Sequence, residues 1–244
     1  MTTQYSASDM AGPLWRRVAD ALRDEIRARA FAPGQQLPTE ISLSERFAVS
    51  RFTTRRALAE LEKEGVIRIE HGRGLFVADD VIPYPIGERT RFTENMSRIN
   101  ATGDRRVLAS ARESGDTETC RWLDLRSGAE VIFVESIAFV GQRPLSLSQS
   151  YYPADRFPGL DDLLRRNPSQ TDALSAYGVL DYTRKRTQII SRLPSRHEAH
   201  LLKIAKTRPV LETQKIDVDP DGRPIAFGVS CYAGDRVQLI VEQP

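Results

Sequence analysis

The sequence contains only two cysteines among 244 residues and no long apolar run. Cys120 and Cys231 are too few for a disulfide framework or a four-thiolate metal site, so we expect both to be reduced and structural. No stretch approaches the roughly 18 consecutive apolar residues of a membrane helix. The first residues also lack the basic and then apolar layout of a signal peptide, which predicts a cytoplasmic protein without a membrane partner.

The chain also lacks a strong excess of charge of either sign. Lys and Arg number 35 against 33 Asp and Glu, which gives a net charge of +2. A total of this size neither indicates nor excludes a nucleic-acid partner. Evidence for or against such a partner must therefore come from the pattern of charged residues along the chain.

Residues 13–78 have the pattern of three helices followed by a hairpin. An apolar residue recurs every four positions between Pro13 and Arg29, at Leu14, Val18, Leu22 and Ile26, which predicts an amphipathic helix. Thr39 and Ser50 are suitable N-caps for two further helices, and only a short break separates these two. From Ile67 onward apolar and polar residues alternate on either side of a glycine-containing turn. This order of elements predicts a winged helix-turn-helix.

The stretch SRFTTRR, residues 50–56, begins the third helix of this pattern. Turning the helix by about 100° per residue directs Phe52 and Arg56 away from the core and Thr54 into it. Arginine offers a rigid fork for guanine or phosphate, threonine and free N–H groups suit phosphate, and phenylalanine suits thymine methyls. An ordinary solvated helix face is the alternative. The expected DNA contacts of this helix are Ser50, Arg51, Phe52, Thr53, Arg55 and Arg56.

The predicted hairpin turn, HGRG, offers a second contact surface. Glycines allow the backbone to approach phosphates closely, and an arginine between them suits the narrow minor groove. A plain connecting turn would use the same residue types. The expected contacts here are His71, Gly72 and Arg73.

The remainder of the chain predicts a second domain after a linker. Pro83 and Pro85 lie among turn-forming residues, so we expect a linker over 79–90. From Arg91 onward, strand-like segments joined by hairpin turns predict a mostly antiparallel sheet with helices on one face, an α+β class. Helices are expected over Phe92–Ile99, over GLDDLLRR and after the capping box that begins at Ser195.

Residues 13–77, from PLWRR to GRGLFV, resemble the DNA-binding domain of the GntR family of bacterial transcription regulators. YYPADRFPGL, GRPI and GDRVQLIVE are similar to the UTRA effector domain of its HutC subfamily, which has a chorismate lyase-like fold. YPIGERTRFTENM most resembles the PhnF regulators of phosphonate metabolism. The resulting domain prediction is a disordered N-terminus over 1–12, a DNA-binding domain over 13–78, a linker over 79–90 and a UTRA effector-binding and dimerisation domain over 91–244.

The resemblance implies base and phosphate contacts through Ser50, Arg51, Thr53, Arg55, His71 and Gly72. Many members carry an arginine where this chain has Ile41, and Phe52 replaces a commonly polar residue. Both departures predict an operator that differs from the family's commonest one.

The resemblance also implies an effector site, with departures. Members that bind phosphosugars use arginines on the strand EVIFVESIAFV, where this chain has Ser136 and Ala138, and a glutamate often found after PI becomes Ala226. This favours an effector other than a sugar phosphate, although a sugar phosphate or an amino-acid catabolite remains the alternative to a phosphonate-pathway signal. An anionic effector would be held by Arg91, Thr93, Ser136, Ser148, Tyr152 and Arg184.

Three other functions are alternatives. A lyase-like enzyme would share the fold, but no set of nucleophile, base and orienting acid stands out in the sequence. His197 and His200 could bind a metal, yet they lack the HExxH spacing and a third ligand nearby. A small-molecule sensor that does not bind DNA is the third. We predict a homodimeric, effector-responsive repressor of a catabolic or uptake operon that binds palindromic double-stranded operator DNA without cofactor or metal.

Overall fold

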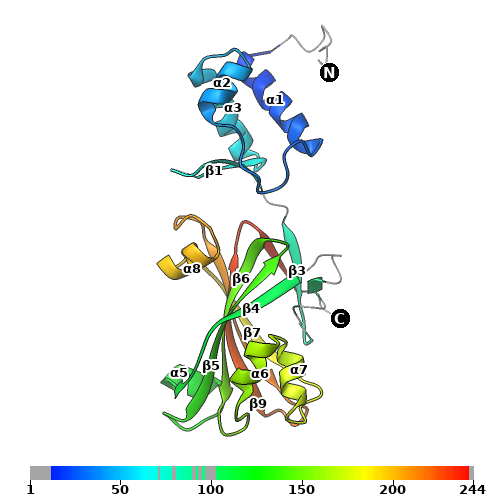
Figure 1. Cartoon of the computed structure of the whole chain (residues 1–244), viewed down its shortest axis with the longest axis vertical. Coiled ribbons are helices and arrows are strands. Elements are labelled where there is room, and N and C mark those ends of the chain that lie inside the picture. The colour runs from blue at the N-terminus through cyan, green and yellow to red at the C-terminus, as the bar shows by residue number, and fades with distance from the viewer. Residues whose placement is uncertain are drawn as a thin grey trace. The chain divides into compact units, whose positions relative to one another are not determined.

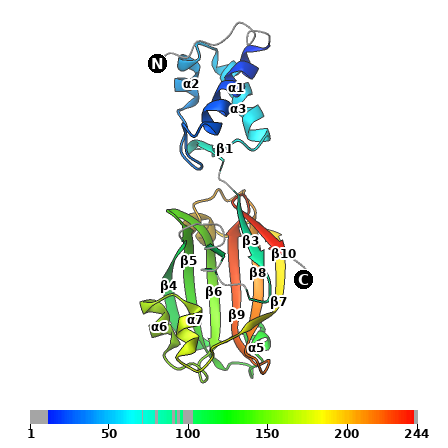
Figure 2. The same cartoon turned by 90° about the vertical axis from the view of Figure 1, so that its right-hand side faces the viewer.

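The computed structural model describes residues 12–70, 72–78, 81–89, 92, 95–96 and 103–241. The chain divides into two compact units, Met1–Asp80 and Val81–Pro244, which are described separately (Figures 1 and 2). The predicted disordered segment over 1–12 lies outside the described residues except for Gly12. Among the helices that the structure describes, none is long and apolar enough to cross a membrane.

The first unit is a winged helix-turn-helix, as predicted. Its elements are α1 (Leu14–Arg27), α2 (Glu40–Arg46), α3 (Arg51–Lys63), β1 (Ile67–Glu70) and β2 (Gly74–Val77), with the two strands antiparallel. Both expected caps are present. The Thr39 side chain accepts a hydrogen bond from the backbone N–H of Ser42, and that of Ser50 accepts one from Thr53. Local capping therefore fixes where α2 and α3 begin.

The core of the first unit lies where the three helices meet the hairpin. Leu22, Leu43 and Leu61 are completely buried. Leu14 was expected on the same apolar stripe, but it is 54% exposed, so the buried face of α1 begins one turn later. At the surface Arg23 of α1 bonds Glu64 at the end of α3, with Nε 3.0 Å from Oε2 and Nη2 2.9 Å from Oε1.

The second unit is built on a six-stranded antiparallel sheet in the order β4-β5-β6-β9-β8-β7. The mostly antiparallel sheet of the predicted α+β fold is confirmed. The strands are β4 (Gly103–Ser114), β5 (Glu130–Val140), β6 (Arg143–Pro153), β7 (Thr183–Arg192), β8 (Val210–Val218) and β9 (Pro224–Ala233). The helices are α5 (Thr117–Trp122), α6 (Leu160–Arg166), α7 (Gln170–Ser175) and α8 (Arg196–Leu201).

Helices cover both faces of this sheet, so the expectation of helices on one face was wrong. Figure 1 shows α5 and α8 on one side of the sheet and α6 and α7 on the other. The cause lies in the strands. On β5, Val134 packs in the cluster that includes α6, whereas Ile137 packs in the cluster that includes α8. Because neighbouring side chains along a strand point to opposite faces, a strand that is apolar on both needs two covering layers.

The predicted linker over 79–90 contains a strand, which corrects that prediction. Residues Ile82–Ile86 form β3, which pairs in parallel with β10 (Val237–Val241) in a separate two-stranded sheet. Ile82 donates its N–H to Arg236 at 2.8 Å, so the alternate positions 83 and 85, both proline, face away from β10. Proline fits an edge strand in this phase because its missing N–H is not needed there.

Two further helix predictions can be compared with the structure. The capping box at Ser195 is confirmed: its backbone N–H donates to Glu198 Oε2 at 2.7 Å, and its Oγ accepts from the Glu198 N–H at 3.2 Å. GLDDLLRR forms α6. Most of Phe92–Ile99 lies outside the described residues. The sequence patterns did not predict β4, α5 or α7.

Candidate DNA interface and effector pocket

The start of α3 exposes its first residues and buries Thr54. Ser50 Oγ lies 2.9 Å from Thr53 Oγ1, so the cap also holds the Thr53 hydroxyl. Phe52 is 77% exposed and Arg51 is exposed. Thr54 is fully buried, and its Oγ1 accepts a hydrogen bond from Ser44 Oγ of α2 at 3.0 Å. The shared hydroxyls fasten α3 to α2, and the expected inward turn of Thr54 is confirmed.

Two arginines in the next turn of α3 contact neighbouring helices. Arg55 Nη2 lies 3.0 Å from Glu40 Oε1 and Nε lies 3.3 Å from Oε2, which forms a two-point ion pair with α2. Arg56 was expected to point straight outward, but its guanidinium lies over the Trp15 ring of α1, 4.7 Å from the centroid. An aromatic face attracts a cation, which explains the difference.

The hairpin tip is built around Arg73. Its Nη1 lies 2.7 Å from Glu70 Oε2, and its carbonyl accepts a hydrogen bond from Gln36 Nε2 at 3.0 Å. Gly72 has a φ of 77° and Gly74 one of 118°, and a Cβ on Gly74 would lie 2.7 Å from Gln36 Nε2. The tip therefore requires glycine. The expected contact at position 71 lies outside the described residues.

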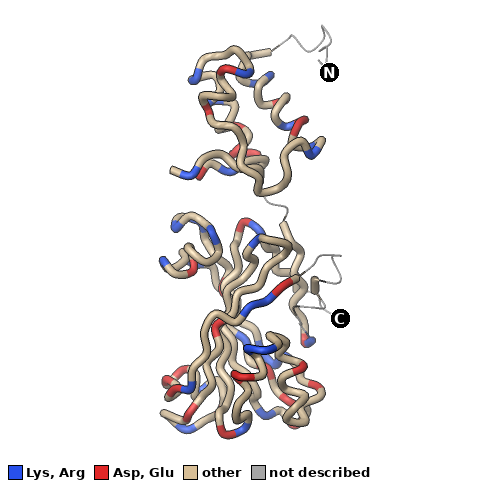
Figure 3. Tube along the Cα trace, in the orientation of Figure 1, with Lys and Arg blue, Asp and Glu red and all other residues tan. Residues whose placement is uncertain are grey.

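Positive and negative residues are interspersed along both units, as Figure 3 shows. This agrees with the small net charge of +2. A polyanionic partner would thus meet a few well-placed arginines instead of a uniformly basic surface.

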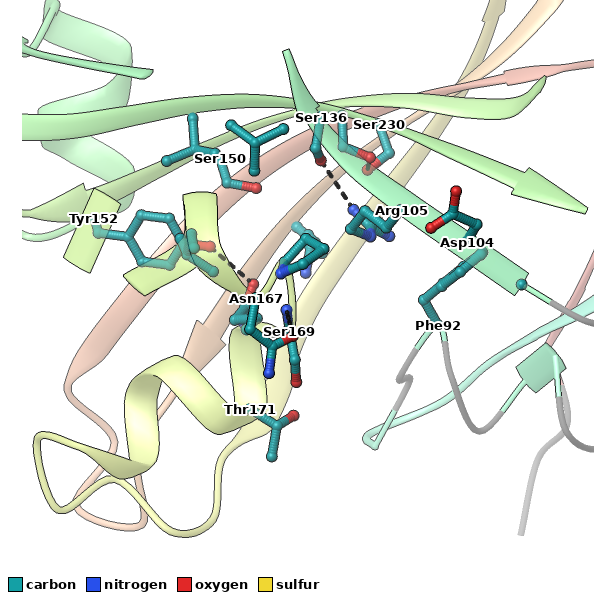
Figure 4. A pocket seen from close by; sticks show the side chains of 18 of the residues that line it. Phe92, Asp104, Arg105, Ser136, Ser150, Tyr152, Asn167, Ser169, Thr171 and Ser230 are labelled. Atoms are coloured by element: carbon teal, nitrogen blue, oxygen red, sulfur yellow. Dashed lines mark hydrogen bonds between the residues drawn. The ribbon is translucent and has the colours of Figure 1, made fainter. Parts of the chain in front are cut away.

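The second unit contains a cavity of about 310 Å³ on the sheet face that carries α6 and α7. The sheet contributes side chains from β4, β5, β6, β7, β8 and β9, the loop before and start of α7 contribute Asn167–Thr171, and Tyr84 contributes from β3. Figure 4 shows Tyr152 and Arg105 pointing into this space from different strands. A site of this size suits a small molecule.

Among the described residues, three cationic side chains line the cavity, together with the acidic side chain of Asp104. Arg105 Nη1 donates to Ser136 Oγ at 3.1 Å (Figure 4). Behind them, Asp217 accepts from Lys215 Nζ at 2.7 Å and from Arg184 Nε at 3.3 Å. Burial lowers the pKa of Lys215 to about 8, although the Asp217 charge opposes this. Burial alone would raise the pKa of Asp217, but the charges of Lys215 and Arg184 hold it below its usual value.

Hydroxyl groups form the neutral part of the wall. Tyr152 is buried, and its hydroxyl donates to Gln170 Oε1 at 3.1 Å. Burial raises the pKa of Tyr152, so it remains a neutral donor. Ser148 Oγ and Ser230 Oγ lie 2.9 Å apart. Such a wall can bind oxygen atoms of a ligand while the cations balance its charge.

Four of the six residues predicted to bind the effector line this cavity: Ser136, Ser148, Tyr152 and Arg184. Arg91 and Thr93 lie outside the described residues.

Sequence reasoning missed the cations Arg105 and Lys215. Some family members carry charged residues at positions where this chain has Ala138 and Ala226. The strand register explains why the cavity is charged nevertheless. Ala138 pairs with Arg105 on β4, and Ala226 pairs with Asp217 on β8. Each neutral position thus has a charged residue on the adjacent strand, a signal that only pairing reveals.

The other polar candidates lie elsewhere. His197 Nε2 lies 3.1 Å from Glu135 Oε1, and within the described ranges no group of three or more His, Cys, Asp or Glu is arranged to hold a metal. Cys120 and Cys231 are both free and buried. Burial raises the pKa of Cys231 to about 12, so this thiol is not poised to react.

Comparison with known proteins agrees with both halves of this architecture. Residues 14–77 match the bacterial regulatory proteins of the gntR family, and residues 102–238 match the UTRA domain. The chain belongs to the GntR family. It is a transcription regulator with a DNA-binding unit and a UTRA effector domain, which removes the lyase-like enzyme from consideration.

Relatives cover nearly the whole chain. An HTH-type transcriptional regulator of Rhizobium meliloti (strain 1021), RB1450, is 34% identical over 99% of this chain and 100% of its own length. The mannosyl-D-glycerate transport/metabolism system repressor MngR of Escherichia coli (strain K12) is 28% identical over 91% of this chain and 92% of its own. The crystal structure of PhnF from Mycobacterium smegmatis has a TM-score of 0.65 and 27% identity, covering 93% of this chain and 99% of that one.

Proposed function

We propose that this GntR-family regulator is a cytoplasmic, homodimeric repressor that an anionic small molecule releases from a palindromic operator. The observation that carries the choice of effector is the cavity in which Arg105, Arg184 and Lys215 gather around hydroxyl groups. Asp217 is bonded to two of these cations, Lys215 and Arg184, while Asp104, which also lines the cavity, pairs with Arg106, so an anion can bind beside Arg105.

The proposed domain boundaries follow from the two units. The DNA-binding domain spans 13–78, and the effector domain begins with β3 at Ile82 instead of position 91. Two copies would present two α3 helices to half-sites about 34 Å apart, one turn of DNA. An effector that binds one arrangement of the dimer better than the other shifts the population away from the DNA-bound form.

We place a phosphonate or related metabolite first among the anions. Similarity to PhnF of Mycobacterium smegmatis supports this choice. A sugar phosphate is the second candidate, because Arg105 supplies a cation beside Ser136, where the resemblance alone had suggested none. A catabolite with a carboxylate is the third, and MngR, named for a mannosyl-D-glycerate system, is a relative consistent with it.

A gel shift on the DNA upstream of the protein's own gene tests this function. The retarded complex should form at low salt and disappear as the correct compound is added from a panel of phosphonates, phosphosugars and imidazole-type acids. Lys215→Met should still bind DNA but require more compound for release. The absence of any shift would contradict DNA regulation, whereas a shift that no anion reverses would contradict the proposed effector class.

A further inference from the structure

Arg55 is held by Glu40 in a geometry that fixes the plane of its guanidinium. The carboxylate contacts both Nη2, at 3.0 Å, and Nε, at 3.3 Å. The two residues come from different helices, since Glu40 is the first residue of α2 and Arg55 lies in the second turn of α3. Two contacts define the orientation of the fork far better than one.

This ion pair contributes little to the stability of the fold. The Arg55 side chain is 74% exposed and that of Glu40 is 27% exposed, and ion pairs in this environment are weakened by water and salt. Glu40 also lies in the first turn of α2, where a negative charge is favourable in any helix. That general effect does not require contact with Arg55. The two-point contact is therefore better explained by a role in orienting Arg55 for binding than by a role in stability.

The contact leaves one edge of the guanidinium unused by Glu40. The carboxylate takes the Nε and Nη2 side, so the Nη1 N–H groups and the second Nη2 N–H point along the other edge. That edge matches two acceptors side by side, as guanine O6 and N7 are in the major groove. A phosphate can also accept two hydrogen bonds from the fork, but the nearby carboxylate weakens attraction to phosphate in general.

Arg56 offers a contrast on the same helix. Its guanidinium lies over the Trp15 ring at 4.7 Å, an interaction made through its face. The N–H donors in its plane stay available for phosphate oxygens.

We propose that Glu40 is a positioning residue that orients Arg55 to read a guanine in the operator. This role rests on the DNA-binding function proposed above. Arg55 supplies the hydrogen bonds, and Glu40 supplies discrimination between operator and other DNA at some expense of general affinity.

The test compares Glu40→Gln with Glu45→Gln, an exposed acid on the same helix whose replacement changes the charge equally. Kd is measured in the full-length protein for operator and for random duplex at several salt concentrations. Glu40→Gln should lower the operator-to-random affinity ratio about tenfold, the worth of one oriented base contact, while random-duplex binding is unchanged or tighter. Glu45→Gln should shift both affinities together.

Arg55→Lys provides a second variant, because lysine keeps the charge but not the planar fork. It should lose the same discrimination as Glu40→Gln, and adding Glu40→Gln to it should cause little further loss. An unchanged affinity ratio in Glu40→Gln, or a uniform gain on both duplexes, would contradict the positioning role alone. A wild-type protein that binds no upstream DNA would contradict the proposed function itself, and the role of Glu40 with it.

Discussion

The arginines proposed to bind ligands in the two units lie in different environments. In the DNA-binding unit, Arg55 and Arg56 lie at the surface, where a carboxylate and an aromatic ring orient them. In the effector domain, Arg184 has a side chain only 10% exposed and shares the buried Asp217 with Lys215. A large polyanion can approach an exposed donor, whereas a small anion must replace water inside a cavity that already carries charge.

The sharpest test of this difference is the stability of the two carboxylate pairs. Asp217→Asn removes the charge between Lys215 and Arg184, and its side chain is only 2% exposed. Because Lys215 and Arg184 then lose the carboxylate that they share in a buried site, the free energy of unfolding of the effector domain should fall by about 3 kcal/mol. Glu40→Gln, at the exposed pair, should lower it by less than about 1 kcal/mol. Denaturant unfolding followed by circular dichroism measures both, and equal losses would contradict the comparison.

The second largest effect is expected at the DNA. Arg55→Ala should cost about 1–3 kcal/mol of operator affinity and relax the sequence preference, because a base contact is lost. Gel shifts on the operator and on single-base variants measure this. An equal loss on every duplex would instead make Arg55 a phosphate contact, and Asp217→Asn, if folded, should leave operator affinity without effector unchanged.

The DNA-binding unit could be predicted closely because its signals are local. Thr39 and Ser50 cap helices within three residues of themselves, and the glycines of the wing meet backbone angles at their own positions. Even the missed strand β3 carries such a signal, since Tyr84 and the isoleucines on either side alternate with the prolines. The prolines were interpreted as a linker although their phase suits an edge strand.

The lining of the cavity that we propose for the effector could be predicted only in part, because it depends on contacts between residues that are distant in the sequence. Ser136 was recognised on its own strand, but Arg105 reaches it only through the pairing of β4 with β5. β4 itself was missed because it is an edge strand, exposed along most of its length, and so lacks a clean alternation of apolar and polar residues. The register between two strands that are distant in the sequence cannot be predicted from the residues of either strand alone.

Lys215 should make the affinity of the effector domain for its ligand depend on pH. Burial lowers its pKa to about 8, so the side chain is charged below this pH and neutral above it. An anion prefers the charged form, so effector affinity should fall about tenfold as the pH rises from about 7 to 9, and binding near pH 8 should take up protons. Calorimetry in buffers of different ionisation enthalpy measures both quantities for a compound that does not titrate in this range. A Lys215→Met protein should bind more weakly with a flat profile.

DNA binding in the absence of effector should not follow the same profile, because Lys215 lines the cavity of the effector domain and is not part of α3. A parallel fall of operator affinity would argue against separate roles for the two sets of cations.

Phe52 should give the smallest effect. It is 77% exposed, and a contact with a thymine methyl would bury part of its ring. Phe52→Ala should therefore cost about 0.8 kcal/mol, and only on operators that keep thymine at the contacted position. Replacing that thymine by uracil, which lacks the methyl group, should abolish the difference between the two proteins. Leu180→Ala, which removes a residue 78% exposed on the effector domain, is the matched control and should change nothing.

The pairing of β3 with β10 also affects the order in which the protein is made. Tyr84 of β3 lines the cavity that we propose for the effector, and among the described strands β3 pairs with Val237–Val241, more than 150 residues later in the chain. The contacts of the winged helix-turn-helix are short-range and can form soon after its residues leave the ribosome. The wall of the cavity can be completed only after β10 has been synthesised. We therefore expect the DNA-binding unit to fold during synthesis well before the effector domain is complete.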